Sequence, residues 1–231
     1  MPNKEWLSRT EALLGIDAVK KLENARVIIF GVGGVGGYAF EALVRSGIKS
    51  IAVVDSDSVS ESNLNRQIIA VRSTLGKLKV EAAKERALDI NPNAKITAYP
   101  LFYSEQTECE INLADYDYII DAIDSVSSKL RLIENAAKCD TPIISSMGAG
   151  NKLNPMGFKI ADIYKTSVCP LARTMRAELK KRGIKKLKCI YSEEAPANTT
   201  KGQRTPASIA TVPSAAGLAI AAEVISDIIN K

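Results

Sequence analysis

The chain has 231 residues, a net charge of +5, 46% hydrophobic and 25% charged residues, and no histidine. These fractions are typical of a globular protein and exclude disordered, collagen-like and coiled-coil classes. Without histidine the chain can form neither a Ser-His-Asp triad nor an imidazole metal site, so any catalysis must use other side chains or a bound cofactor.

Short apolar strands are predicted to alternate with helices along the chain. The predicted strands cover 26–30, 51–54, 95–99, 118–122, 142–146, 157–162 and 188–192. The predicted helices cover 8–22, 36–46, 77–89, 127–139, 170–182 and 212–229, and a long loop is expected over 194–213. This order predicts an α/β fold, a doubly wound, Rossmann-like, mostly parallel sheet with helices on both faces and a C-terminal extension.

A glycine-rich motif follows the first predicted strand and opens the next helix. Its glycines are Gly31, Gly33, Gly34 and Gly36. Gly31 allows a tight turn, Gly33 lets a phosphate approach the backbone, and Gly36 lets the helix pack on the strand. Asp55 lies 19 residues beyond Gly36, at a strand end where a carboxylate accepts hydrogen bonds from ribose hydroxyls. The motif therefore predicts a nucleotide site.

Further polar residues are expected at the same carboxyl edge of the sheet, where open α/β sheets bind ligands. Asn63 and Arg66 follow the second strand, Lys79 lies on the next helix, and Asp124 follows the fourth strand. Arginine and lysine that converge on one nucleotide suit a triphosphate better than a dinucleotide, and Asp124 suits Mg²⁺ held between phosphates. The sequence therefore predicts ATP with Mg²⁺ rather than NAD.

These motifs, in this order and spacing, resemble those of the ThiF/MoeB/HesA superfamily, adenylate-forming enzymes related to ubiquitin activators. The matching segments are Gly31–Gly37, Asp55–Asp57, Ser62–Gln67, Gly76–Lys79, Asn91–Pro92 and Asp121–Asp124. The resemblance implies that Asp55 holds the ATP ribose. The nucleotide-binding set that it implies consists of Gly31, Gly33, Gly34, Gly36, Asp55, Asp57, Asn63, Arg66, Lys79 and Asp124.

The same resemblance implies a catalytic set of four charged residues. Arg66 and Lys79 would contact the phosphates together with Asn63, and Asp124 would hold Mg²⁺ and steer the α-phosphate. Arg9 matches an arginine that the family sends across a homodimer interface to the partner's ATP, where it would act as an arginine finger on pyrophosphate.

Within the superfamily, the second half of the chain resembles the tRNA threonylcarbamoyladenosine dehydratases. The matching segments are Ile160–Lys165, Pro170–Arg173, Leu179–Ile184, Tyr191–Glu194 and Ser208–Ile220. Cys169 departs from the pattern, since an aspartate is expected before Pro170. The resemblance implies an ATP-dependent dehydratase that cyclises the threonylcarbamoyl group next to the tRNA anticodon through an acyl-adenylate. It leaves open a partner from a sulfur-transfer or cysteine desulfurase system.

A basic block at 165–188 supports a polyanionic partner. It holds nine basic residues and one acidic residue, a net charge of +8, so the rest of the chain carries −3. On the predicted helix, Arg173, Arg176 and Lys180 would share one face at helical spacing. We expect these three residues to bind the tRNA backbone, although a solvated lysine-rich face would have the same pattern.

We expect one ThiF-type domain over 1–231. It divides into an N-terminal helical arm (1–25), a Rossmann-like ATP-binding core (26–150) and a part for substrate binding and dimerisation (151–231). The helix at 212–229 is expected to be buried rather than to span a membrane, because Pro213, Glu223 and Asp227 interrupt its apolar run. A polar N-terminus and few cysteines predict a cytoplasmic protein.

Three other functions fit parts of the sequence. An adenylyltransferase for a ubiquitin-like or sulfur-carrier protein shares the motifs, but the zinc-binding CxxC pairs usual in that group are absent. An NAD-dependent oxidoreductase leaves Arg66, Lys79 and Asp124 unexplained, and a non-catalytic nucleotide-binding scaffold would not need them. Nothing in the sequence next to Cys169 or Cys189 indicates a reactive thiolate.

Overall fold

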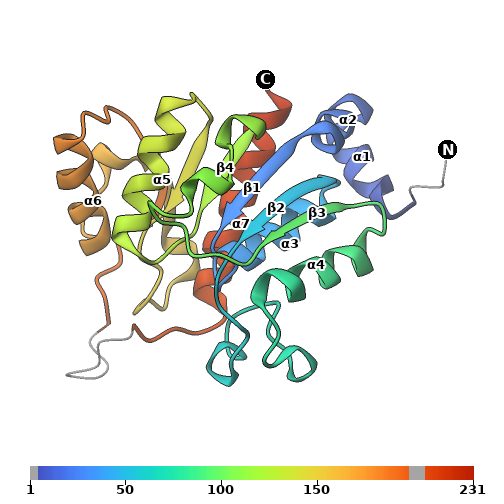
Figure 1. Cartoon of the computed structure of the whole chain (residues 1–231), viewed down its shortest axis with the longest axis horizontal. Coiled ribbons are helices and arrows are strands. Elements are labelled where there is room, and N and C mark those ends of the chain that lie inside the picture. Colours follow the sequence, from blue (N-terminus) through green and yellow to red (C-terminus); the bar gives the residue numbers. More distant parts are fainter. Residues whose placement is uncertain (1–4, 198–205) are drawn as a thin grey trace.

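Seven apolar runs form one sheet in the computed structural model, which describes residues 5–197 and 206–231. The strands are β1 (Arg26–Phe30), β2 (Ser50–Val54), β3 (Lys95–Tyr99), β4 (Tyr118–Asp121), β5 (Ile143–Ser146), β6 (Phe158–Asp162) and β7 (Lys188–Ser192). Their order is β3-β2-β1-β4-β5-β7-β6; β6 runs antiparallel to β7 and the other pairs are parallel (Figure 1). The predicted mostly parallel α/β sheet is confirmed. Its strand order reverses between β1 and β4, so a crevice is expected at their carboxyl ends.

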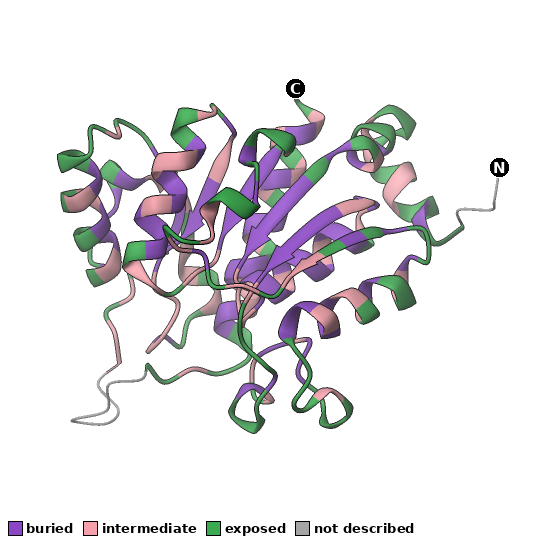
Figure 2. Ribbon diagram, in the orientation of Figure 1, coloured by how far each residue is buried: buried purple, intermediate pink, exposed green. Residues whose placement is uncertain are grey.

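The helices cover the two faces of this sheet. They are α1 (Ser8–Leu14), α2 (Ile16–Asn24), α3 (Gly36–Arg45), α4 (Lys79–Ile90), α5 (Val126–Lys138), α6 (Pro170–Lys181) and α7 (Thr211–Ile229). Strand β1 shows how the sheet separates two cores, because successive side chains of a strand point to opposite faces. Val27 and Ile29 pack with residues of α3, α4 and α7. Ile28 and Phe30 pack with residues of α5 on the other face. The inner strands β1, β2, β4, β5 and β7 are accordingly mostly buried, whereas the edge strands β3 and β6 are partly exposed (Figure 2).

The N-terminal arm differs from the single helix predicted over 8–22. Gly15 has a φ of 87° and separates α1 from α2, because only glycine adopts this conformation without strain. The arm is anchored by Leu7, which is 1% exposed and lies beside Gly47, just past the end of α3. Since α3 starts at the glycine-rich loop and runs for ten residues, about 15 Å, the arm lies at the opposite, amino edge of the sheet.

Helix α7 packs along α3, and this contact explains its apolar composition. Ala216, Ile220 and Val224 are buried in the core that it shares with α3, which confirms the predicted buried helix. Within the part of the chain that the structure describes, α7 is the one helix long and apolar enough to cross a membrane. The loop predicted over 194–213 is described only at its ends, and 198–205 lie outside the described residues.

Candidate active site

The glycine-rich loop joins β1 to α3 at the carboxyl edge of the sheet. Gly31 has a φ of 86°, and a Cβ atom there would lie 2.6 Å from the carbonyl oxygen of Ala122. A Cβ atom at Gly36 would overlap the carbonyl oxygen of Gly31. Gly33 is different, because the nearest atom to its absent Cβ is Gln67 Nε2 at 3.7 Å. Gly31 and Gly36 thus allow close packing, whereas Gly33 borders open space that a phosphate could enter.

Asp55 follows β2 and is held against this loop. Its Oδ2 accepts a hydrogen bond from the backbone N–H of Val32 at 2.8 Å, and its Oδ1 accepts one from Asp57 at 2.9 Å. Burial raises the pKa of the Asp55 carboxyl, while Lys79 and the two backbone donors act in the opposite direction. Further donors at this carboxylate, such as ribose hydroxyls, would favour its ionised form.

Lys79 begins α4 and points back toward the same carboxylates. Its side chain is 7% exposed, with Nζ 2.6 Å from Asp57 Oδ2 and 3.9 Å from Asp55 Oδ1. The structure therefore brings Asp55, Asp57 and Lys79 together, as the sequence predicted for one edge of the sheet. In this arrangement the ammonium group is paired with Asp57, so phosphate binding by Lys79 would compete with that ion pair.

The segment that contains Asn63 and Arg66 lies over the loop. Asn63 is buried, and its Oδ1 accepts a hydrogen bond from the backbone N–H of Ser60. Arg66 Nη1 donates to the carbonyl oxygen of Ser62 at 2.8 Å. The Cγ of Arg66 would lie 3.6 Å from a Cβ atom at Gly34, so the two predicted residues are neighbours.

Gln67, in the same segment, was not among the predicted site residues. It is 7% exposed, lies beside Gly33, and its Oε1 is buried without a hydrogen-bond partner among the described residues. A buried polar atom left without a partner carries a free-energy cost that a bound ligand can relieve. The sequence contains one indication that Gln67 belongs to the site, namely its position at the end of the matching segment Ser62–Gln67.

Asp124 follows β4, and its surroundings differ from those of Asp121. Asp124 is exposed and takes part in no ion pair that the structure describes. Asp121 is 0% exposed, and its Oδ2 lies 2.9 Å from Lys129 Nζ. Asp124 is therefore the aspartate of this motif that faces solvent at the crevice, which is the position predicted for a ligand of Mg²⁺.

Helix α6 starts at the same edge of the sheet. The absent Cβ of Gly148, which follows β5, would lie 3.6 Å from Cys169 Sγ, and Cys169 is the N-cap of α6. The Cys169 side chain makes no cap hydrogen bond, so the cysteine does not supply the cap that an aspartate often provides. Ala172 and Met175 are fully buried against α5 and β7. The opposite face of α6 is therefore free for other contacts.

The structure separates the cations of the basic block into two groups. Arg176 is half-buried and donates to both the carbonyl oxygen and the hydroxyl of Thr166, so it is not part of a freely solvated face. Lys181, Arg182 and Lys188 pair with acidic residues. Within the block, the exposed cations that form no ion pair among the described residues are Lys165, Arg173, Lys180, Lys185 and Lys186.

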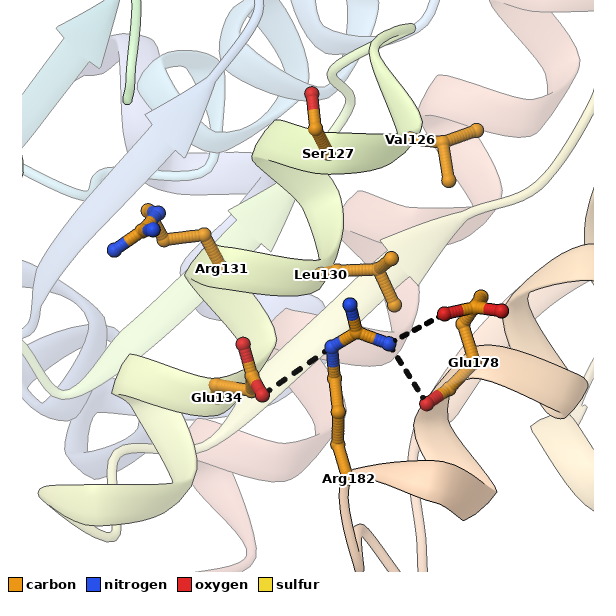
Figure 3. A pocket seen from close by; sticks show the side chains of 7 residues that line it. All are labelled: Val126, Ser127, Leu130, Arg131, Glu134, Glu178 and Arg182. Carbon is orange, nitrogen blue, oxygen red and sulfur yellow. Dashed lines mark hydrogen bonds and ion pairs between the residues drawn. The ribbon is translucent and has the colours of Figure 1, made fainter. Parts of the chain in front are cut away.

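A hollow of about 480 Å³ lies between α5 and α6, away from the glycine-rich loop. Arg182 points into it and pairs with Glu178 at 2.6 Å and with Glu134 at 3.3 Å (Figure 3). Arg131, on its other side, pairs with Glu105 and Glu108. Because both arginines are already neutralised, this hollow does not form an anion site.

Arg9 lies away from the carboxyl edge of its own sheet, and Cys189 is buried. Arg9 is exposed on α1, at the amino edge of its own sheet. Burial raises the pKa of the Cys189 thiol to about 12, so this group is protonated at neutral pH and is a poor nucleophile. Among the described residues there is no group of three or more Cys, His, Asp or Glu side chains that could hold a metal ion.

Comparison with known proteins identifies the group to which this chain belongs. The ThiF family model matches residues 7–231. The tRNA threonylcarbamoyladenosine dehydratase of Bacillus subtilis is 42% identical, covering 96% of this chain and 94% of that protein. A solved structure of the E. coli tRNA N6-threonylcarbamoyladenosine dehydratase TcdA in complex with ATP is 30% identical, with a TM-score of 0.89 over 98% of this chain and 95% of that one.

A second group of relatives is matched over a shorter stretch. The adenylyltransferase and sulfurtransferase UBA4 of Meyerozyma guilliermondii is 35% identical over 55% of this chain and 30% of its own length. The match to the dehydratases includes the second half of the chain, with the α6 region. The chain therefore belongs to the ThiF family.

Proposed function

We propose that this chain is an ATP-dependent tRNA threonylcarbamoyladenosine dehydratase. The observation that carries the proposal is the similarity to dehydratases over 96% of the chain, against 55% for the adenylyltransferase. Two features of the structure support it: the glycine-rich loop lies beside Asp55, Arg66 and Gln67 at the carboxyl edge, and unpaired cations lie around α6. The four cysteines that the structure describes are free thiols, which is in keeping with action in the reducing cytoplasm.

The reaction that we propose proceeds by carboxylate activation. An oxygen of the threonyl carboxylate attacks the α-phosphorus of ATP, the bond to pyrophosphate breaks, and an acyl-adenylate forms. A nitrogen or oxygen of the neighbouring carbamoyl group then attacks the activated carbonyl carbon and closes the ring. AMP leaves, and the net change in the nucleoside is the loss of water. Positioning of the reactants and stabilisation of phosphate charge supply most of the rate.

In this proposal the residues at the carboxyl edge bind different parts of ATP. Asp55 accepts hydrogen bonds from the ribose, the backbone at Gly33 lies against the phosphates, and Arg66 and Lys79 neutralise their charge. Gln67 Oε1 is buried without a hydrogen-bond partner among the described residues, and the space beside Gly33 is not filled by the protein. Both observations support a bound nucleotide here, because a ligand could supply the missing partner and fill the space.

The residues present also fit Mg²⁺ bound together with ATP. Mg²⁺ commonly takes one or two carboxylates from the protein and its other ligands from phosphates and water. Exposed, unpaired Asp124 supplies such a carboxylate, and Asp57, which follows β2 at the same edge of the sheet, is a second acidic group of the proposed site. When bound, the ion would withdraw charge from the phosphates as pyrophosphate leaves.

The proposed function is tested by pyrophosphate release in the presence of three acceptors. We expect release with tRNA that carries threonylcarbamoyladenosine, and little with the same tRNA lacking the modification. A ubiquitin-like carrier protein with a free C-terminus is the third acceptor. Release with the carrier alone would instead favour the adenylyltransferase, and stabilisation of the fold by NAD but not by Mg-ATP would contradict both.

Arg9 is proposed to act in the partner's site, because it lies at the amino edge of its own chain. The arm exposes Leu13 (83%), Ile16 (54%) and Trp6 (44%), and several large exposed apolar residues within one short segment are typical of a protein interface. We expect Arg9→Ala and Asp124→Ala to be inactive separately. Mixed in equal amounts they should regain about a quarter of wild-type activity, since half of the dimers contain one intact site. Absence of recovery after subunit exchange would contradict the role across subunits.

Arg173 and Lys180 are proposed to bind the tRNA backbone. Replacing both with alanine should weaken tRNA binding and flatten its dependence on salt by about two units, because phosphate contacts release counterions. ATP affinity should not change. Lys95→Ala with Lys138→Ala removes the same charge from exposed sites elsewhere that form no ion pair among the described residues and is the matched control. Equal salt slopes for the two double variants would mean that the α6 cations are only solvated. Arg176 is kept, because its replacement would also remove the hydrogen bonds to Thr166.

A further inference from the structure

A fully buried ion pair lies directly beneath Asp124. Asp121 ends β4 and Lys129 lies in the second turn of α5. Both side chains are 0% exposed, with Lys129 Nζ 2.9 Å from Asp121 Oδ2. Removing two charges from water is costly, and well-packed apolar residues of similar volume are often as stable or more stable. The pair therefore calls for a reason other than stability.

Both members of the pair bind the backbone of one residue, Ile123. Asp121 Oδ1 accepts a hydrogen bond from the N–H of Ile123 at 3.2 Å. Lys129 Nζ donates to the carbonyl oxygen of Ile123 at 3.1 Å. Ser145, on neighbouring β5, donates to Asp121 Oδ2 at 2.5 Å and fixes the carboxylate from the side. The next residue along the chain is the exposed Asp124.

This segment also touches the glycine-rich loop. The carbonyl oxygen of Ala122 would be 2.6 Å from a Cβ atom at Gly31, and the N–H nitrogen of Ile123 would be 3.2 Å away. Two elements of the proposed site are thus joined: the loop that faces the phosphates and the peptide that carries Asp124. The ion pair anchors this peptide through its two hydrogen bonds to the backbone of Ile123.

We propose that Lys129 is a positioning residue for Asp124. Its ammonium group, neutralised by Asp121, holds the carbonyl group of Ile123 and so sets where the Asp124 carboxylate stands relative to the phosphates. The inference rests on the proposed function, since it takes Asp124 to act on Mg-ATP. It adds a residue that contacts neither nucleotide nor RNA and that the sequence alone did not single out.

The test compares Lys129→Met, which keeps the length of the side chain but loses its donor, with Lys129→Arg, which keeps charge and donors. Calorimetry gives the affinity for ATP with and without Mg²⁺. Pyrophosphate release gives the rate. For Lys129→Met we expect the affinity for ATP without Mg²⁺ to be unchanged. The factor by which Mg²⁺ increases the affinity for ATP, and the rate of pyrophosphate release, should each fall about tenfold or more, as is usual for residues that orient a metal ligand. Lys129→Arg should recover most of both.

Stability is controlled by two further variants. Asp121→Asn combined with Lys129→Met leaves no uncompensated buried charge, so it should fold even where the single variant does not, and it should remain impaired with Mg-ATP. Lys188→Met breaks an ion pair with Asp227 at the amino edge and should lower stability without changing the response to Mg²⁺.

The possible results separate this inference from the proposed function. A double variant that binds Mg-ATP as the wild type does would overturn the positioning role, and so would a wild-type chain whose ATP affinity does not respond to Mg²⁺. A wild-type chain that binds Mg-ATP tightly but releases no pyrophosphate with modified tRNA would refute the dehydratase proposal. The role of Lys129 would then still be decided by the binding data.

Discussion

Asp124→Asn is expected to fold normally and to adenylate its substrate about a hundredfold more slowly. The side chain is exposed and unpaired among the described residues, so its replacement removes no packing and breaks no ion pair. What it removes is one negative charge at a metal and phosphate site, a loss on the order of 3 kcal/mol in the transition state. The rate should be measured by single-turnover pyrophosphate release with modified tRNA.

Asp140→Asn is the matched control for this variant. Asp140 is also exposed, lies between α5 and β5 at the amino edge, and has a φ of 54°, a conformation that asparagine tolerates well. The control removes the same charge far from the crevice and should react at the wild-type rate. Near-normal turnover of Asp124→Asn would move the metal role to Asp57, since Asp121 is fully buried and paired with Lys129.

Gly33→Ala is expected to abolish ATP binding while leaving stability almost unchanged. The new methyl group has room, since its nearest neighbour is Gln67 Nε2 at 3.7 Å, and the backbone there needs no positive φ. It would, however, occupy the space through which a phosphate approaches the loop. Thermal unfolding should give a melting temperature close to that of the wild type, and calorimetry should detect no ATP binding at concentrations that saturate the wild type.

Gly36→Ala, three residues away, is expected to lower the stability of the fold, because its methyl group has no room. Its methyl group would overlap the carbonyl oxygen of Gly31 and press on the side chain of Ala122. Because the first of these atoms belongs to the backbone, the loop must shift, and we expect a loss of about 3 kcal/mol in the free energy of unfolding. A Gly36→Ala chain as stable as the wild type, or a Gly33→Ala chain that binds ATP normally, would contradict the division of roles between these glycines.

The sequence predicted the sheet and the edge on which the site lies because both depend on local patterns. Apolar runs bounded by turn residues located the strands, and the motifs that follow them fall at the carboxyl edge once the strands are parallel. It did not predict the break at Gly15, where helical spacing continues on both sides. Nor did it predict the burial of Lys129, since a lysine in a serine-rich helix start has the pattern of a surface residue. Such contacts arise only from tertiary packing.

The contact between α7 and the glycine-rich loop has a consequence for the order of events during synthesis. Pro213 lies against Gly34, and a Cβ atom at Gly217 would overlap the carbonyl oxygen of Val35. The wall behind the loop is therefore supplied by the last helix of the sequence, about 180 residues after the loop itself. Because synthesis proceeds from the N-terminal end, the loop is made well before this helix, and a nascent chain lacks the support of α7 until that helix has been made. We therefore expect a product that is truncated before α7 to lack this support behind the loop and to bind the nucleotide poorly.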